Sequence, residues 1–475
     1  MQTIPLEADK PHTKEALIAF LTGCQLKAST VGYPQLASIT LPAGGLDPLA
    51  VLESIYEETE LHFYVERKQD GFAIAGAEAV AACESAGPDR FKDSRAFIEK
   101  TLENTIAIGD GALPFFGPHF FCAFAFAEAN EAGARFPNAR VFVPRWQVSL
   151  LDGRSIAVAN ALVDAESDVE EIAARIWSAN TKFRGFDADS AMVLEARKEL
   201  RILDTVEDGG AGRFVESVYA AVEEIRRGDY EKVVLARALD LDANQVFHPL
   251  EILNTLRERY ADCFSFSLAN GDGQSFIGAS PERLARAQGG KLLTEALAGT
   301  VRRGVTASED AAMGASLLSS EKDRHEQSVV LDSILRRLDD LGVSRTEFDE
   351  QPRLKKLQNV QHLHSRVSGN LPEGLHLLDV VSELHPTPAV GGSPREAACA
   401  RIRELEGFDR ELYAGAIGWI DSKGDGEFLV GIRSAMIDGD RSRLFAGGGI
   451  VAASDPEKEL AETELKFQVL KENLL

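Results

Sequence analysis

Positive charge is scarce in this chain of 475 residues, and cysteine is scarcer still. Lysine and arginine together number 51 against 75 aspartates and glutamates, which leaves a formal net charge of −24 at pH 7. Phosphate backbones and anionic lipid surfaces repel so acidic a chain, so neither nucleic acid nor a membrane is expected as a partner. If the ligand is a small anion, the protein must gather its cations in one pocket.

Targeting and membrane-spanning segments are also lacking. The N-terminal stretch Met1–Lys10 has neither the basic nor the apolar region of a signal peptide. The longest uncharged run, Gly111–Ala127, is shorter than the roughly 20 residues of a membrane helix and is interrupted by prolines. Five scattered cysteines without a Cys-x-x-Cys pair indicate reduced thiols. We therefore expect a cytoplasmic protein.

Apolar residues are plentiful, at 44% of the chain, and no repeat or low-complexity tract is visible. This composition excludes disorder over most of the chain, because it is ample for large cores. The clearest change of composition is the polar, glycine-rich stretch Val206–Gly212. It predicts a division into residues 1–206 and residues 213–475.

Two pairs of apolar segments are typical of β-hairpins. His62–Arg67 and Gly71–Gly76 flank a short polar turn. Phe264–Leu268 and Ser275–Ala279 flank a turn at Asn270-Gly271, which is a strong hairpin signal. We expect an antiparallel pair of strands at each place.

Helical periodicity occurs between such strands. Ser320–Leu341 has an apolar stripe at helical spacing and begins with a capping Ser-x-x-Asp sequence. Tyr413–Val451 predicts a meander of three strands, with breaks at Lys423–Gly426 and Asp438–Asp440. Hairpins interspersed with helices favour an α+β fold with large antiparallel sheets over a doubly wound parallel sheet.

Acidic and basic side chains recur at helical spacing in two places. Glu459, Glu462 and Lys466 share one face of the last predicted helix, and Glu326 follows Lys322 by one turn on another. Two glutamates from different helices, joined by water and a ligand oxygen, suit Mg²⁺, which prefers hard oxygen ligands. Solvated salt bridges along each helix are the alternative that the spacing alone favours.

Two loops and two isolated residues are further candidates. The glycine run Ala446–Val451 allows backbone N–H groups close to an anion, although a tight β-bend explains it as well. The proline loop Leu384–Glu396 predicts a rigid pocket wall leading into a helix capped by Ser393. Lys232 begins an apolar strand and Glu282 directly follows one. A strand lysine usually faces solvent, but in a low-dielectric pocket it can act as a base.

Taken in order, these segments resemble the chorismate-utilising enzymes, which include the isochorismate, salicylate, anthranilate and aminodeoxychorismate synthases. The resemblance is collinear from about Arg213 to Lys471 and looser before it, through Gly71–Gly76 and Phe136–Trp146. The matching stretches are KVVLAR, GASPE, ALAGT, SEKDRHE, VQHL, HPTPAVGG, FLVGIRSA and FAGGGIVAASDPEKELAETELK. The resemblance implies an α+β fold of large, mainly antiparallel sheets packed as a sandwich with helices outside. It places the chorismate-binding catalytic region in residues 213–475 and makes residues 1–206 the variable part of the same fold.

Positions at which members of this family differ indicate an isochorismate synthase. Bacterial-type aminodeoxychorismate synthases carry a nucleophilic lysine where this chain has Ala298, and anthranilate synthases lack the lysine that this chain has as Lys232. The sequence Pro-Thr-Pro-Ala at Pro386–Ala389 differs from the Val-Thr-Ala type usual in salicylate synthases. The resemblance thus implies reversible, Mg²⁺-dependent conversion of chorismate to isochorismate, by addition of water at ring carbon C2 and loss of the C4 hydroxyl.

The resemblance also implies a role for each candidate residue. Lys232 is the general base that activates water, and Glu282 is the acid that protonates the leaving hydroxyl. Glu326 and Glu462 are magnesium ligands, and Glu459 orients metal-bound waters. The substrate-binding residues are Gly299 and Thr300 at the ring carboxylate, His362 and Ala389 at the ring, and Arg433, Gly447 and Lys466 at the enolpyruvyl carboxylate.

Two alternatives remain open at this point. A salicylate synthase would also eliminate pyruvate from the isochorismate that it makes. A family member without activity would serve as a binding protein, although intact Lys232, Glu282, Glu326 and Glu462 disfavour this. The product could feed menaquinone or phylloquinone synthesis, or a salicylate-based siderophore. No amidotransferase domain or subunit is expected, and the sequence predicts no oligomeric state.

Overall fold

The computed structural model describes residues 1–5, 13–184 and 200–474. The helices are α1 (Lys14–Val31), α2 (Pro48–Ser54), α3 (Arg90–Glu103), α4 (Val169–Arg184), α5 (Gly210–Arg227), α6 (Pro249–Arg259), α7 (Ala307–Ser319), α8 (Glu321–Asp340), α9 (Leu377–Leu384), α10 (Arg395–Glu406) and α11 (Pro456–Leu474), with a 3₁₀ turn η1 (Lys68–Asp70). The strands are β1 (Gln2–Pro5), β2 (Gln35–Ala43), β3 (Leu61–Arg67), β4 (Phe72–Ser85), β5 (Thr105–Gly109), β6 (Phe120–Phe124), β7 (Ala139–Leu151), β8 (Arg154–Val163), β9 (Ile202–Glu207), β10 (Lys232–Ala243), β11 (Phe264–Asn270), β12 (Gln274–Ser280), β13 (Arg283–Gln288), β14 (Lys291–Arg302), β15 (Ser344–Phe348), β16 (Arg353–Lys356), β17 (Val360–Asn370), β18 (Gly392–Ser393), β19 (Ala416–Ile420), β20 (Gly426–Val430), β21 (Ser434–Asp438) and β22 (Arg441–Ile450).

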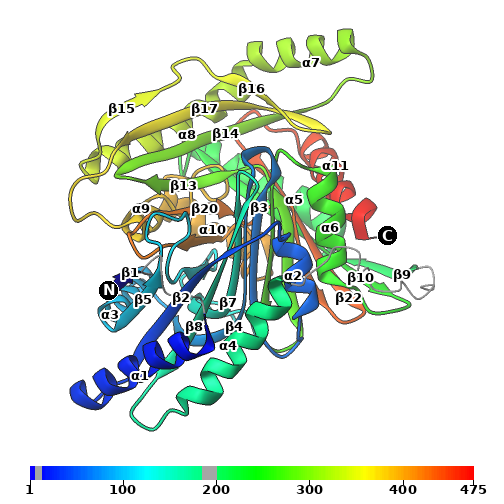
Figure 1. Ribbon diagram of the computed structural model, residues 1–475. Helices are drawn as coiled ribbons and strands as arrows, with labels where there is room; N and C mark the ends of the chain where they lie inside the picture. The colour runs from blue at the N-terminus through cyan, green and yellow to red at the C-terminus, as the bar shows by residue number, and fades with distance from the viewer. Residues whose placement is uncertain (6–12, 185–199, 475) are drawn as a thin grey trace.

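Hydrogen-bonded strand pairs build two large layers that share β7 (Figure 1). The first layer has the order β9-β10-β22-β21-β12-β11-β3-β4-β7-β8-β2-β5-β1. The second has the order β7-β6-β19-β20-β13-β14-β17, and both β15 and β16 pair with β17. Among the described strands, only β5 pairs in parallel, with β1 and β2. The predicted mainly antiparallel α+β fold is therefore confirmed.

The two layers pack face to face on one apolar core. Phe63 of β3, in the first layer, stacks on Phe121 of β6, in the second, with ring centroids 4.4 Å apart. A Cβ atom on Gly76 of β4 would lie 2.2 Å from the Phe121 ring, so the layers meet closely there. Contact between the inner faces of two sheets is the packing of a β-sandwich.

Helices cover the outside of this sandwich. The helices α1 and α4 lie side by side against β2 and β8, at the lower edge of Figure 1. Helix α11 packs on β22 and α5, whereas α8 packs on β14 and β17. The two termini lie on opposite sides of the view in Figure 1. The arrangement leaves α8 and α11, which carry four of the predicted site residues, beside the strands that carry Gly299, Thr300, His362 and Gly447.

The local signals in the sequence predicted several elements correctly. β3 pairs with β4 across η1, and β11 pairs with β12 across the Asn270-Gly271 turn. The Oγ atom of Ser320 caps α8 by accepting a hydrogen bond from the N–H of Asp323, and Leu341 follows the helix. Both hairpins and this helix are therefore confirmed.

The predicted three-stranded meander is wrong, because Tyr413–Val451 contains four strands, β19 to β22. The missed break is at Gly431–Arg433, where Arg433 has a positive φ of 51°. β20 pairs with β13 and β19 in the second layer, whereas β21 pairs with β12 and β22 in the first. The chain thus crosses between the layers at Arg433.

Two further local predictions are corrected. The glycine run does not form a bend, because Gly447, Gly448 and Gly449 lie inside β22 and pair with β10. Ser393 does not cap the helix that follows it: Pro394 is the N-cap residue of α10 and no side chain caps it. Ser393 instead pairs with Lys232, as part of β18.

The predicted boundary Val206–Gly212 spans the end of β9 and the beginning of α5. Strands on the two sides of this stretch pair with each other, as β3 does with β11 and β6 with β19. Both parts therefore contribute to both layers, and the functional division into residues 1–206 and 213–475 stays a prediction.

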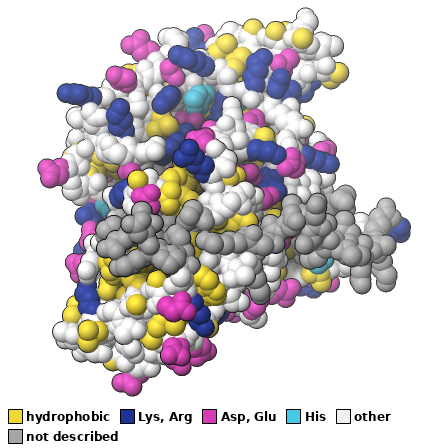
Figure 2. All heavy atoms as spheres, viewed as in Figure 1, with side chains coloured by type: hydrophobic (Ala, Val, Ile, Leu, Met, Phe, Trp, Pro, Cys, Tyr) yellow, Lys and Arg dark blue, Asp and Glu magenta, His cyan; other side chains and the backbone are white. Residues whose placement is uncertain are grey.

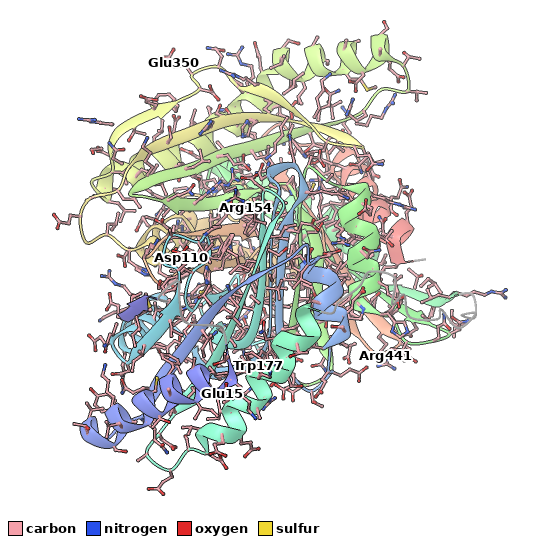
Figure 3. All side chains as sticks on the ribbon, viewed as in Figure 1. Glu15, Asp110, Arg154, Trp177, Glu350 and Arg441 are labelled. Carbon is pink, nitrogen blue, oxygen red and sulfur yellow. The ribbon has the colours of Figure 1, made fainter. Side chains whose placement is uncertain are left out.

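Charges of both signs are interspersed over the surface seen in Figure 2. Among the side chains labelled in Figure 3, Glu15, Arg154 and Glu350 are exposed. Within the described ranges, no helix is both long and apolar enough to cross a lipid bilayer.

Candidate active site

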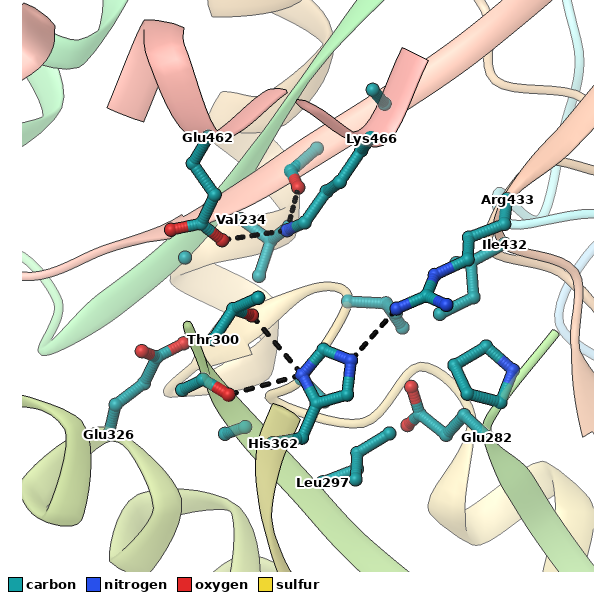
Figure 4. Close-up of a pocket in the computed structure, with 18 of the residues that line it drawn as sticks. Val234, Glu282, Leu297, Thr300, Glu326, His362, Ile432, Arg433, Glu462 and Lys466 are labelled. Carbon is teal, nitrogen blue, oxygen red and sulfur yellow. Dashed lines mark hydrogen bonds and ion pairs between the residues drawn. The ribbon is translucent and has the colours of Figure 1, made fainter. Parts of the chain in front are cut away.

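A cavity of about 840 Å³ lies where α8 and α11 meet β14, β17 and β22 (Figure 4). Every site residue predicted from the sequence lines it, with the exception of Lys232. These lining residues are Glu282, Gly299, Thr300, Glu326, His362, Ala389, Arg433, Gly447, Glu459, Glu462 and Lys466.

Lys232 lies beside the cavity and is fully buried. It is the first residue of β10, where Ser393 pairs with it. Its Nζ atom is 2.9 Å from Oε1 of Glu326, which lines the cavity. The contact is an ion pair without hydrogen-bond geometry, so within the described residues the ammonium group has no hydrogen-bond acceptor.

The glycines of β22 make room for the side chains around the cavity. A Cβ atom on Gly449 would lie 2.2 Å from Oε1 of Glu326 and 3.1 Å from Cε of Lys232. A Cβ atom on Gly447 would lie 2.8 Å from the Tyr413 hydroxyl. Side chains from other elements therefore approach this strand closely, which explains the glycine run without a bend.

Glu282 lies on the connection between β12 and β13 and is 4% exposed. Its N–H donates to Oγ of Ser280, and its carbonyl oxygen accepts from the N–H of Val430. Among the described residues, none forms a hydrogen bond with its carboxyl group. Burial raises the pKa of Glu282 to about 8, and the charge of Glu295 acts in the same direction. Glu282 therefore carries a proton at neutral pH.

His362 connects two parts of the cavity wall (Figure 4). The guanidinium of Arg433 donates from Nη2 to Nε2 of His362 at 2.8 Å. Arginine has no acceptor, so Nε2 is unprotonated and the ring proton is on Nδ1. Nδ1 then donates to the carbonyl oxygen of Gly299 at 3.1 Å, with Oγ1 of Thr300 at 3.2 Å. Burial and the charges of Arg433 and Lys466 hold the pKa of His362 well below its usual range.

Gly299 and Thr300 lie at a bulge in the pairing of β14 with β17. Gly299 has a φ of 68°, a conformation that side chains with a Cβ atom rarely adopt. The bulge turns the Gly299 carbonyl and the Thr300 hydroxyl toward His362. The positive φ at this position therefore explains why the ALAGT stretch has a glycine there.

Three glutamates of the cavity each pair with a lysine. Glu462 Oε1 accepts from Nζ of Lys466 at 2.8 Å, and the same Nζ donates to the carbonyl oxygen of Gly447 at 2.7 Å. Glu459 Oε1 accepts from Lys322 at 2.8 Å, and Glu326 pairs with Lys232 as described above. Burial raises the pKa of Glu459, whereas Lys466 outweighs the effect of burial on Glu462 and holds its pKa below the usual value.

The residues that could bind a metal are carboxylates. Within the described residues, no three His, Cys, Asp or Glu side chains are close enough to form a metal site by themselves. Mg²⁺ needs only one or two carboxylates, because water and ligand oxygens complete its shell. Burial raises the pKa of Asp323 most, and the charges of Glu326 and Glu462 raise it further. Glu326, Glu459 and Glu462 all line the cavity, and their hard oxygen donors fit a divalent cation.

Some lining residues were not found by sequence reasoning. Tyr413 precedes β19, is 4% exposed and stacks on Phe445 with ring centroids 5.0 Å apart. Nothing in its local sequence indicated a site. Asp323 lines the cavity one turn before Glu326, a spacing that could have indicated it.

Comparisons with known proteins show the family to which the chain belongs. Residues 20–475 match the family described as chorismate binding enzyme. The isochorismate synthase MenF of Bacillus subtilis is 32% identical over 453 residues, which are 93% of this chain and 94% of that protein. The salicylate biosynthesis isochorismate synthase of Pseudomonas aeruginosa is 44% identical over 254 residues, 54% of this chain and 53% of that protein.

A solved structure matches over nearly the whole chain. The menaquinone-specific isochorismate synthase MenF from Escherichia coli superposes with a TM-score of 0.76 and 26% identity. The match covers 96% of this chain and 100% of that structure. The similarity thus extends through both layers as well as the cavity, and the chain belongs to the family of chorismate-binding enzymes.

Proposed function

We propose that this protein is an isochorismate synthase, which converts chorismate reversibly to isochorismate. The observation that carries the proposal is the cavity, in which a buried, protonated Glu282 shares the space with cations suited to a substrate with two carboxylates. The similarity to the Bacillus subtilis isochorismate synthase over nearly both full lengths supports it. Relatives named for menaquinone and for salicylate biosynthesis both match, so the proposal ends at isochorismate.

In the proposed reaction, Lys232 and Glu282 move the two protons. Nζ of Lys232 takes a proton from water as the water oxygen bonds to ring carbon C2. The ring double bond shifts, the C4–O bond breaks, and Glu282 gives its proton to the departing hydroxyl, which leaves as water. One water enters and one leaves, so the product is an isomer, and solvent restores both protonation states. The raised pKa of Glu282, about 8, supports this role.

The substrate carboxylates would be held by residues that already have fixed orientations. His362 holds Nη2 of Arg433, while the buried Nη1 has no partner among the described residues and is free to donate to a carboxylate. Lys466 and the backbone of Gly447 are hydrogen-bonded to each other in the cavity lining and would contact the enolpyruvyl carboxylate. Thr300 and Gly299 would contact the ring carboxylate.

Glu326 and Glu462 would hold Mg²⁺, and Glu459 would orient its waters. When bound, the ion would supply a positive charge that neutralises the ring carboxylate. In its absence, Lys322 pairs with Glu459 and Lys466 with Glu462, which fixes the orientation of these two carboxylates.

A coupled assay tests the proposal. Chorismate and Mg²⁺ are supplied with and without an added isochorismate-pyruvate lyase, and salicylate is followed by its fluorescence. We expect salicylate only when the lyase is present. Salicylate without the lyase would make the protein a salicylate synthase, and no turnover in either assay would support a binding protein without activity.

Ala298 gives a second test, because it lines the cavity where a nucleophilic lysine would otherwise lie. The enzyme should add water even when ammonium is abundant, and product analysis by mass spectrometry distinguishes the two outcomes. An amino-substituted product as the main species would contradict the assignment within the family.

A further inference from the structure

Three side chains of the second layer meet directly behind Glu282. Glu295 lies in β14, Lys355 in β16 and His364 in β17, and Glu295 is 7% exposed. Oε1 of Glu295 accepts from Nζ of Lys355 at 2.8 Å, and Oε2 lies 2.7 Å from Nε2 of His364. The three residues lie outside the lining of the cavity, so a ligand bound there would not touch them.

The Glu295–Lys355 ion pair holds the main chain on both sides of Glu282. Nζ of Lys355 donates to the carbonyl oxygen of Pro281 at 2.6 Å. The N–H of Arg283 donates to Oε1 of Glu295 at 2.8 Å. One ion pair therefore binds the peptide group before Glu282 and the one after it, and we call this arrangement the clamp.

Burial of this ion pair is not explained by packing alone. Two buried charges lose their hydration, and apolar residues of similar volume often give equal or greater stability. Each of the two charged groups also makes one hydrogen bond to the main chain of the segment that carries Glu282. The ion pair therefore orients the short stretch from Pro281 to Arg283, which carries Glu282, the acid of the proposed reaction.

We propose that Glu295 and Lys355 are positioning residues for the acid of the proposed reaction: they hold the main chain of Glu282, and their opposite charges adjust its protonation. The proposal rests on the proposed function, because that function makes Glu282 the acid. Neither residue touches the substrate, so both act through Glu282.

The charges around Glu282 give the two residues opposite effects. Burial raises its pKa most, and the negative charge of Glu295 raises it further. The positive charges of Lys355 and Lys232 lower it. Tyr413 also faces Glu282 but is neutral, because burial holds the pKa of its hydroxyl above the usual value. Removing the charge of Glu295 must therefore lower the pKa of Glu282, and removing that of Lys355 must raise it.

The pH dependence of kcat/KM tests the charges of the clamp. Its alkaline limb reports the acid in the free enzyme. Glu295→Gln keeps the shape and the acceptor for Arg283, and should move this limb to lower pH by about one unit. Lys355→Met should move it to higher pH, and the double variant should return it toward the wild-type position. Limbs that stay in place or move in the same direction would overturn the proposal.

The orientation given by the clamp is tested by Glu295→Ala, which removes the acceptor as well as the charge. We expect kcat to fall about 100-fold with KM little changed, because a small displacement of a catalytic group has an effect of this size. Glu78→Gln is the matched control, because Glu78, like Glu295, takes part in three hydrogen bonds but lies in β4, outside the cavity. It should change neither kcat nor the pH profile. If Glu295→Ala does not fold, Glu295→Gln still decides through the pH profile.

A measurement that needs no turnover separates this proposal from the proposed function. The pKa of Glu282 in the folded protein, about 8, exceeds its ordinary value of 4.5. Wild-type protein must therefore lose stability relative to Glu282→Gln as the pH rises between these two values. In a Glu295→Gln background this loss should end at lower pH, as measured by thermal unfolding of the four proteins. A shifted endpoint without isochorismate formation would reject only the function; normal turnover with no shift in either measurement would reject only the clamp.

Discussion

The cavity has two walls, and within the described part of the chain glutamate side chains have lysine partners on one wall but not on the other. On the wall formed by α8 and α11, Glu326, Glu459 and Glu462 each pair with a lysine. On the opposite wall, between β12 and β13, Glu282 is buried and has no hydrogen-bond partner for its carboxyl group among the described residues, whereas Glu326 and Glu462 are partly exposed. Glutamate side chains with the same intrinsic pKa are therefore placed in two different electrostatic environments.

The pKa values follow this difference. Lys466 holds the pKa of Glu462 below its ordinary value although burial opposes it. The pKa of Glu282 rises to about 8, because burial and the charge of Glu295 outweigh the opposing charges of Lys355 and Lys232. A glutamate that stays ionised can bind a cation, whereas a protonated one can donate. The difference supports the proposal that Glu462 helps to hold the metal and that Glu282 transfers the proton.

The largest expected effect concerns the wall formed by α8 and α11, where Mg²⁺ is proposed to bind. Removal of divalent cations with EDTA should abolish isochorismate formation, and added Mg²⁺ should restore it. Glu326→Gln should raise the Mg²⁺ concentration needed for half-maximal activity by at least about tenfold, because a ligand charge is lost. Thermal unfolding of the variant serves as a control for folding. Full activity in a metal-free sample would show that this wall has another purpose.

The next effect concerns the wall that carries the acid. Glu282→Gln should lower kcat by about 10²–10⁴-fold with little change in chorismate affinity, because the amide cannot protonate the leaving hydroxyl. Lys232→Ala should lose a comparable factor. The double variant should be far less than additively worse, since both groups act in one transition state. Steady-state kinetics with a binding titration separates these effects, and near-wild-type turnover by either single variant would contradict the proposed roles.

A smaller effect is expected between the walls, at His362. This neutral ring receives a hydrogen bond from Arg433 and donates one to Gly299. His362→Ala should raise KM for chorismate about tenfold, because Arg433 loses the bond that orients it. Its kcat should fall less than that of Glu282→Gln. If instead kcat collapses while KM stays constant, His362 takes part in the chemistry itself.

Sequence reasoning was most successful where the signal is local. The alternation in Phe264–Leu268 and Ser275–Ala279, with a turn residue pair between them, specified a hairpin without knowledge of the rest of the chain. The helical spacing of Glu459, Glu462 and Lys466 likewise placed all three on one face, and all three line the cavity. Spacing alone could not show which neighbours this face meets.

Sequence reasoning failed where a structural feature depends on residues that are distant in the sequence. FLVGIRSA resembles one continuous strand, but its two halves pair with β13 and β12 in different layers, so the chain turns at Arg433. The glycines of β22 are explained by Glu326, Lys232 and Tyr413, which are distant in sequence. The ion pair behind Glu282 also joins residues from β14 and β16, and neither stands out locally.

The smallest expected effect is on stability, and it tests the comparison of the two walls without any substrate. The folded-state pKa of Glu282 is raised, so its contribution to stability is present at low pH and is lost as the pH rises toward about 8. The pKa of Glu462 is lowered, so its contribution is present above the ordinary value and is lost as the pH falls. Relative to wild type, Glu282→Gln should therefore gain thermal stability between about pH 5 and pH 8. Glu462→Gln should be least stable relative to wild type at neutral and alkaline pH, and the difference should shrink in acid. Differential scanning calorimetry of the three proteins in EDTA measures both trends, and parallel pH dependence of the two variants would show that the two walls do not differ as proposed.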